Sequence, residues 1–267
     1  MSMLESLILG FLQGIAEFLP ISSSGHLAIA QALFGLDQVP LLFDVFLHLA
    51  TLAAVCLYFW KKIWELLKSL AKWISRKALQ EEDKTNLRLI IAIILSTIVT
   101  GVMGVITSRF IPELSIKYVC TGFLVTSALL IVSSILEKRS TQHTQVPSKK
   151  QSLFIGFMQG IGTLPGISRS GSTIAGALLC KVDRKTAGEY SFIISIPAIL
   201  GAFILELKDL DKVNQAVGAA PVAAGCAAAF AVGYISLTLL MKLIRKGRLQ
   251  WFACYLIPAG ILGLLLL

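Results

Sequence analysis

The residues best suited to do chemistry are a carboxylate, an imidazole and a guanidinium, each set within an apolar stretch. Glu17 and His26 lie within 3–34, and Arg169 lies within 153–179. Ionisable side chains at membrane depth are costly and mark functional sites. Arginine forms a bidentate fork with phosphate, and neutral imidazole serves as nucleophile or general base. We therefore expect a phosphate or diphosphate ligand, with a carboxylate substrate or an inorganic anion as the alternatives.

A second pattern points to a cation beside that ligand. Gln13 and Glu17 are four residues apart, which places them on one face of a helix. Their oxygens suit a hard divalent cation, Mg²⁺ or Ca²⁺, held together with phosphate oxygens of the substrate. The alternative is a structural ion pair between Glu17 and Arg169.

Two Ser/Gly turns are expected to bind the anion. They have the form S-x-S-G, and each leads into a half-helix, 26–34 or 172–180; their shared residues are Ser22, Ser24, Gly25, Ser168, Ser170 and Gly171. Helix N-termini expose N–H groups and the positive end of the helix dipole, which bind anions and disfavour imidazolium at His26. Asp44 and His48, four residues apart, are expected to bond within their helix or to support the site from behind.

The two turns belong to an internal repeat. A shift of 146 residues aligns 10–25 with 156–171 without a gap, and nine of the sixteen positions are identical. The ionisable residues do not follow the repeat: Arg169 stands opposite Ser23, and Glu17 opposite Thr163. A duplicated helix-packing motif would explain the small residues but not these charges. The repeat therefore predicts a site where its two copies meet.

Composition places the chain in a membrane. It has 267 residues, of which 56% are hydrophobic and 15% charged, against about 25% charged in soluble domains. The net charge of +9 comes from bases in short segments between apolar stretches, which indicates loops at a membrane surface and no nucleic-acid binding. Six stretches are long enough to span a bilayer: 41–60, 87–108, 118–136, 190–207, 216–243 and 251–267.

The loop charges predict how the chain is threaded. Basic segments (61–88, 137–150, 181–185, 242–248) are assigned to the cytoplasm. The stretches 3–34 and 153–179, broken by Pro, Gly and Ser, then become re-entrant hairpins from opposite faces. We expect one all-α membrane domain, 1–267, with about six transmembrane helices and two re-entrant hairpins. Its inverted repeats are approximately 1–136 and 150–267, joined by a polar cytoplasmic loop, 137–150; segment 61–77 is expected as an amphipathic surface helix.

Two motifs resemble those of the undecaprenyl-diphosphate phosphatases, the bacitracin-resistance family of bacterial membranes. They are QGIAEFLPISSSGH, from Gln13 to His26, and PGISRSGST, from Pro165 to Thr173. The resemblance implies hydrolysis of undecaprenyl diphosphate to undecaprenyl phosphate, the lipid carrier of cell-wall synthesis. It also implies a divalent cation, a site facing outward from the plasma (inner) membrane, and a homodimer.

The same resemblance assigns roles to residues. The family's serine/histidine cluster falls on Ser22, Ser23, Ser24 and His26, and its arginine motif falls on Ser168, Arg169, Ser170 and Thr173. The family's (E/Q)xxxE pattern is matched by Gln13 and Glu17, so Glu17 should carry more of any metal binding. His26 is the expected nucleophile, with Ser23 orienting the phosphate or acting in its place. The rival function is a secondary transporter or flippase for a lipid phosphate, because inverted repeats with broken helices are typical of transporters.

Overall fold

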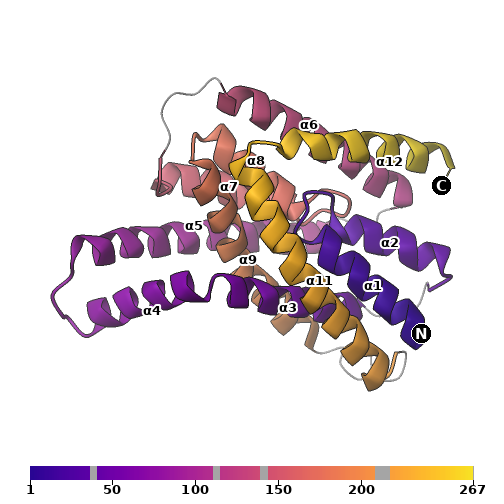
Figure 1. Cartoon of the computed structure of the whole chain (residues 1–267), viewed down its shortest axis with the longest axis horizontal. Helices are drawn as coiled ribbons and strands as arrows, with labels where there is room; N and C mark the ends of the chain where they lie inside the picture. Colours follow the sequence, from indigo (N-terminus) through magenta and orange to yellow (C-terminus); the bar gives the residue numbers. More distant parts are fainter. Residues whose placement is uncertain (37–40, 111–114, 139–143, 208–216, 267) are drawn as a thin grey trace.

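The computed structural model describes residues 1–36, 41–110, 115–138, 144–207 and 217–266 (Figure 1). These residues form helices, and the one bridge of strand type among them joins Thr144 to Val182. Parts of three predicted segments lie outside the described residues: 139–143 in the polar loop, Ala216 at the start of one span and Leu267 at the end of another.

Six helical segments of the described chain are long and apolar enough to cross a membrane, which confirms the predicted membrane class. They are α3 (Leu41–Tyr58), α5 (Glu81–Phe110), α6 (Ile116–Lys138), α9 (Arg184–Glu206), α11 (Ala219–Arg245) and the 3₁₀ turn η2 (Leu249–Phe252) continued by α12 (Ala253–Leu266). Two of them begin six residues earlier than their hydropathy predicts: α5 at 81 instead of 87, and α9 at 184 instead of 190. α9 starts at Arg184 because Asp183 caps it, accepting from the N–H groups of Lys185 and Thr186.

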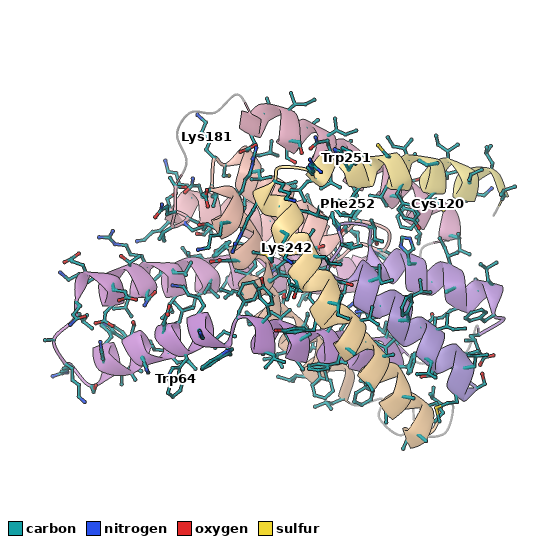
Figure 2. All side chains as sticks on the ribbon, viewed as in Figure 1. Trp64, Cys120, Lys181, Lys242, Trp251 and Phe252 are labelled. Carbon is teal, nitrogen blue, oxygen red and sulfur yellow. The ribbon has the colours of Figure 1, made fainter. Side chains whose placement is uncertain are left out.

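The other early start, that of α5, comes from its pairing with α4 (Trp60–Ile74). Asp83 in the first turn of α5 accepts from Ser69 Oγ at 2.9 Å and from Lys72 Nζ, both on α4. The two helices extend together to the left of the bundle in Figure 1, and Figure 2 shows Trp64 on this extension, away from the central helices. The predicted helix at 61–77 is thus confirmed, and its place on a membrane surface stays a prediction.

The two broken stretches form two matching pairs of short helices. They are α1 (Met3–Ala16) with α2 (Ser23–Leu33), and α7 (Lys149–Ile161) with α8 (Arg169–Leu179). The shift of 146 residues carries the first and last residues of α2 onto those of α8. It also carries the capping box of Ser2 and Glu5, at the start of α1, onto that of Ser148 and Gln151 at the start of α7. The breaks are therefore confirmed, while their re-entrant course through a bilayer stays a prediction.

The copies are interlocked, because the first helix of each packs on a helix of the other. α1 packs along α11, and α7 packs along α5 (Figure 1). Glycine permits both contacts: a Cβ at Gly10 would lie 2.1 Å from the carbonyl oxygen of Gly225, and one at Gly156 would lie 2.6 Å from that of Ser96. These close approaches bring the turns after α1 and α7 to the middle of the molecule.

Candidate active site

The two S-x-S-G turns cap the helices that follow them with the same side-chain hydrogen bond. Ser22 Oγ accepts from the N–H of Gly25 at 3.3 Å, and Ser168 Oγ accepts from the N–H of Gly171 at 3.1 Å. Each is an N-cap, which satisfies one of the free N–H groups of the first turn and leaves the positive end of the helix facing the turn. The serine-rich sequence thus builds two similar anion-attracting helix starts, one in each copy.

The turns differ in backbone conformation at the capping serine. Ser22 has φ 72° and ψ 95°, whereas Ser168 has φ −71° and ψ 118°. A residue with a Cβ rarely adopts positive φ, and such strain costs about 1–3 kcal/mol. Strain of this kind concentrates at functional sites. The first copy therefore carries strain next to the residues expected to do chemistry, Ser23 and His26.

Glu17 is the centre of a buried cluster that joins the two copies. Its side chain is 5% exposed. Carboxylate Oε2 accepts from Ser23 Oγ at 2.6 Å and from Gln13 Nε2 at 3.2 Å, while Oε1 accepts from Arg169 Nη2 of the second copy. Four predicted site residues, Gln13, Glu17, Ser23 and Arg169, are thereby brought into direct contact.

Two atoms of this cluster have no hydrogen-bond partner among the described residues. They are Arg169 Nη1, a donor, and Gln13 Oε1, an acceptor, and both are buried. An unpaired buried polar group costs about 1–3 kcal/mol or more. A phosphate oxygen would satisfy the arginine, and a cation would satisfy the amide oxygen. The cluster is therefore incomplete in a way that fits a phosphate and a metal ion.

His26 lies on the same turn but has its own set of partners. Its Nδ1 lies 2.8 Å from the carbonyl oxygen of Ser22, and its Nε2 lies 2.7 Å from the hydroxyl of Tyr255 on α12. The ring is stacked on Phe123 of α6, with centroids 5.0 Å apart. The sequence predicts that the carboxylate, the imidazole and the guanidinium meet. The structure brings Glu17 and Arg169 into contact, whereas the ring of His26 bonds to a residue of α12.

The remaining predicted phosphate-binding residues mostly hold the turns in shape. Thr173 Oγ1 donates to the carbonyl of Arg169 at 2.8 Å and contacts Ser191 Oγ. Ser170 Oγ donates to the carbonyl of Phe18 at 3.2 Å, which ties the two copies together. Ser24 is exposed. Phosphate contacts from these hydroxyls stay a prediction, whereas the bond from Thr173 to the carbonyl of Arg169 is observed.

With this geometry in place, comparison with known proteins identifies the family. The family model "Bacitracin resistance protein BacA" matches residues 6–262. The chain belongs to the BacA family. It is 48% identical over 261 residues to the undecaprenyl-diphosphatase of Treponema denticola, covering 98% of this chain and 96% of that protein.

Two further relatives carry the same name. An undecaprenyl-diphosphatase of Borrelia recurrentis is 37% identical over 262 residues, covering 96% of each chain, and one of Methanosphaera stadtmanae is 37% identical over 279 residues, covering 100% of this chain and 98% of that protein. The resemblance drawn from the Gln13–His26 and Pro165–Thr173 motifs is confirmed. Since each similarity covers nearly the whole chain, it includes every residue of the Glu17 cluster.

The sequence motifs missed the closeness of His48 to Glu17. His48 Nε2 lies 3.3 Å from Glu17 Oε2, and its Nδ1 donates to the carbonyl of Asp44 at 2.7 Å. Asp44 Oδ1 in turn accepts from Gln31 Nε2 at 2.8 Å. A protonated His48 therefore forms an ion pair with Glu17 at Oε2, the oxygen that also accepts from Ser23 and Gln13. The i, i+4 spacing of Asp44 and His48 signalled their pairing, but not the contact that α3 makes with Glu17.

Proposed function

We propose that this chain hydrolyses undecaprenyl diphosphate to undecaprenyl phosphate and inorganic phosphate, recycling the lipid carrier of cell-wall synthesis and conferring bacitracin resistance. The observation that carries the proposal is the buried contact of Arg169 with Glu17. It leaves Arg169 Nη1, at the start of α8, without a partner among the described residues. The relatives' names support the same activity. A polyprenyl tail can stay among lipids while its diphosphate enters this polar centre.

Arg169 and the helix starts bind and stabilise the terminal phosphoryl group. Nη1 of Arg169 is a donor held ready for a phosphate oxygen, and Glu17 fixes the guanidinium through Nη2. The first N–H groups of α2 and α8 add positive partial charge. Preorganised positive groups of this kind are usually the largest contribution to phosphoryl transfer. Both copies of the repeat provide a helix N-terminus, but only the second provides a guanidinium, that of Arg169.

His26 acts as the nucleophile in this proposal. Since the carbonyl oxygen of Ser22 can only accept, Nδ1 carries the proton, and the neutral ring presents its lone pair at Nε2. Nε2 attacks the terminal phosphorus as the bridging P–O bond breaks, and undecaprenyl phosphate leaves. Water then hydrolyses the phosphoimidazole, which releases inorganic phosphate and restores the ring. Ser23, whose hydroxyl donates to Glu17, orients the phosphate.

A divalent cation, Mg²⁺ or Ca²⁺, fits beside Glu17. Gln13 Oε1 is a buried oxygen with no partner among the described residues, and Gln13 Nε2 donates to Glu17 Oε2, so the two side chains lie together. Oxygen ligands are those that both ions prefer. Gln13 and Glu17 would hold the ion, which when bound offsets negative charge on the diphosphate. Because Gln13 and Glu17 supply only two side chains, oxygens of the substrate would have to provide the remaining ligands.

We also propose a cellular location and an oligomeric state. The chain lies in the bacterial plasma membrane with the turn of α1 and α2 open to the outside, and it forms a homodimer. The loop charges support this orientation, because it places the segments rich in lysine and arginine on the cytoplasmic side, where such loops are usually found. The family resemblance supports the dimer.

Phosphate release from farnesyl or undecaprenyl diphosphate by the purified protein in detergent tests the function. We expect release that depends on Mg²⁺ or Ca²⁺ and falls at least tenfold in Glu17→Ala, His26→Ala and Arg169→Ala. Glu82→Ala, an exposed carboxylate at the start of α5, is the control and keeps full activity. Full activity in all three site variants would contradict the site. Absence of release under every condition would contradict the hydrolase and favour transport of a lipid phosphate.

A further inference from the structure

His26 contacts three groups, and two of them lie outside the two sequence motifs. Ser22 lies within its own turn, but Phe123 belongs to α6 and Tyr255 to α12. Tyr255 makes two contacts with the ring. Its hydroxyl lies 2.7 Å from Nε2, and its ring is stacked beside the imidazole, with centroids 5.7 Å apart and planes 22° apart.

The proton positions of this arrangement follow from its chemistry. Nδ1 of His26 faces a carbonyl oxygen, which only accepts, so Nδ1 is the protonated nitrogen. In the neutral ring Nε2 is then an acceptor, and the phenol is the donor that meets it. The carbonyl of Ser22 thus sets the tautomer, and the hydroxyl of Tyr255 fixes the orientation of the ring by donating to Nε2 from α12.

Tyr255 is also placed where it is able to move. It is 49% exposed, and it lies on a different helix from every residue of the Glu17 cluster. α12 packs along α6; in Figure 2, Cys120 marks α6 and Trp251 marks η2, which leads into α12. Because the phenol hydroxyl is hydrogen-bonded to the lone pair of Nε2, a phosphorus atom can reach Nε2 only after this bond is broken and the phenol has rotated away. The exposed side of Tyr255 provides room for that rotation.

We infer that Tyr255 is a positioning residue for His26: its hydroxyl holds the Nδ1–H imidazole in one ring orientation and releases Nε2 to the terminal phosphate of a polyprenyl diphosphate when the substrate binds. This inference rests on the proposed phosphatase activity for its kinetic part. Its structural part, the hydrogen bond that sets the ring, stands apart from any activity.

Tyr255→Phe tests the kinetic part because it keeps the ring and removes the hydroxyl. We expect kcat to fall about tenfold, the effect of one hydrogen bond of ordinary strength, with KM changed less than about twofold. Tyr234→Phe is the matched control, a partly exposed phenol on α11, and keeps wild-type kinetics. In a His26→Ala background, Tyr255→Phe should have no further effect, because a residue that acts through His26 loses its action with it.

¹⁵N-histidine NMR of the protein in detergent tests the structural part without any turnover. The chain has three histidines, so His48→Gln and His143→Gln assign the signals by elimination. We expect His26 in the wild type to show a protonated Nδ1 and an unprotonated Nε2. In Tyr255→Phe we expect the Nε2 signal to shift, because its hydrogen bond from the phenol is lost, while Nδ1 stays protonated. An unchanged His26 signal in Tyr255→Phe, or an equal loss of kcat with and without His26, would overturn the inference. If wild-type protein releases no phosphate, the proposed function fails, while the NMR result still decides the hydrogen bond.

Discussion

Arg169 of the second copy donates to the carboxylate of Glu17 in the first copy, across 152 residues of sequence. Both side chains are largely enclosed, at 16% and 5% exposed. This contact joins the two halves of the repeat and fixes the guanidinium that is to bind phosphate. The ion pair, which the sequence presents as the alternative to a cation at Glu17, is thus observed. It is compatible with a phosphate clamp, because Nη2 makes the pair while Nη1 has no partner among the described residues and is left for the ligand.

The pair predicts a separable effect on stability and activity. Glu17→Gln leaves Arg169 buried without its counter-charge, which should lower the free energy of unfolding by about 3–5 kcal/mol. Phosphate release should fall about 10²–10³-fold. The double variant Glu17→Gln/Arg169→Met removes both charges, so it should regain part of the thermal stability and none of the activity. Thermal unfolding in detergent and phosphate release measure the two effects. A double variant less stable than Glu17→Gln would show that the charges are not paired.

His48 is expected to support Glu17 through its contact with Oε2. His48→Ala removes a hydrogen-bonding partner of a buried carboxylate, so activity should fall about tenfold or more. His48→Gln keeps a side-chain N–H donor and should lose less. The same substitutions at His143, which is expected in the polar loop and lies outside the described residues, are the control and should change nothing. An equal loss in His48→Ala and His48→Gln would mean that packing, and not the contact with Glu17, is what matters.

A negative charge at position 13 is expected to raise the affinity for the divalent cation. Gln13→Glu places a second carboxylate beside Glu17, so the Mg²⁺ or Ca²⁺ concentration for half-maximal phosphate release should fall about tenfold. Direct cation binding by calorimetry, without substrate, should show the same direction. Gln159→Glu is the matched control at the equivalent position of the second copy, where Nε2 donates to Thr100 and the carbonyl of Ile194. Tighter cation binding in both variants would argue against a site that is specific to Gln13 and Glu17.

The fold was largely predictable because the bilayer imposes it on the sequence. Six apolar stretches gave six helices, and the two stretches broken at 17–22 and 162–168 gave paired short helices. The errors lie at helix ends. α5 and α9 begin in polar sequence, because the pairing of Asp83 with α4 and the cap from Asp183 extend them beyond their apolar parts.

The site was predictable only where a motif carries it. Glu17, Gln13, Ser23 and Arg169 stand out because polar and ionisable groups are rare in apolar segments. His48 and Tyr255 reach the site from α3 and α12, through the packing of whole helices. Neither has a local sequence pattern that indicates its partner. The direction of His26 toward α12 was missed for the same reason, since it depends on a tyrosine 229 residues away.

The crossing of α1 and α11 gives the last prediction, on stability. A Cβ at Gly10 would lie 2.1 Å from the carbonyl oxygen of Gly225, so Gly10→Ala must push the two helices apart and should cost about 1–3 kcal/mol. Gly156→Ala, the equivalent change where α7 meets α5, should cost a similar amount, because its Cβ would lie 2.6 Å from Ser96 O. Gly101→Ala is the control: its Cβ meets nothing within 4 Å, and alanine favours a helix by about 1 kcal/mol, so this variant should be as stable as the wild type or more so. Thermal unfolding in detergent ranks the three, and a Gly10→Ala protein as stable as Gly101→Ala would refute the close crossing that brings Glu17 to Arg169.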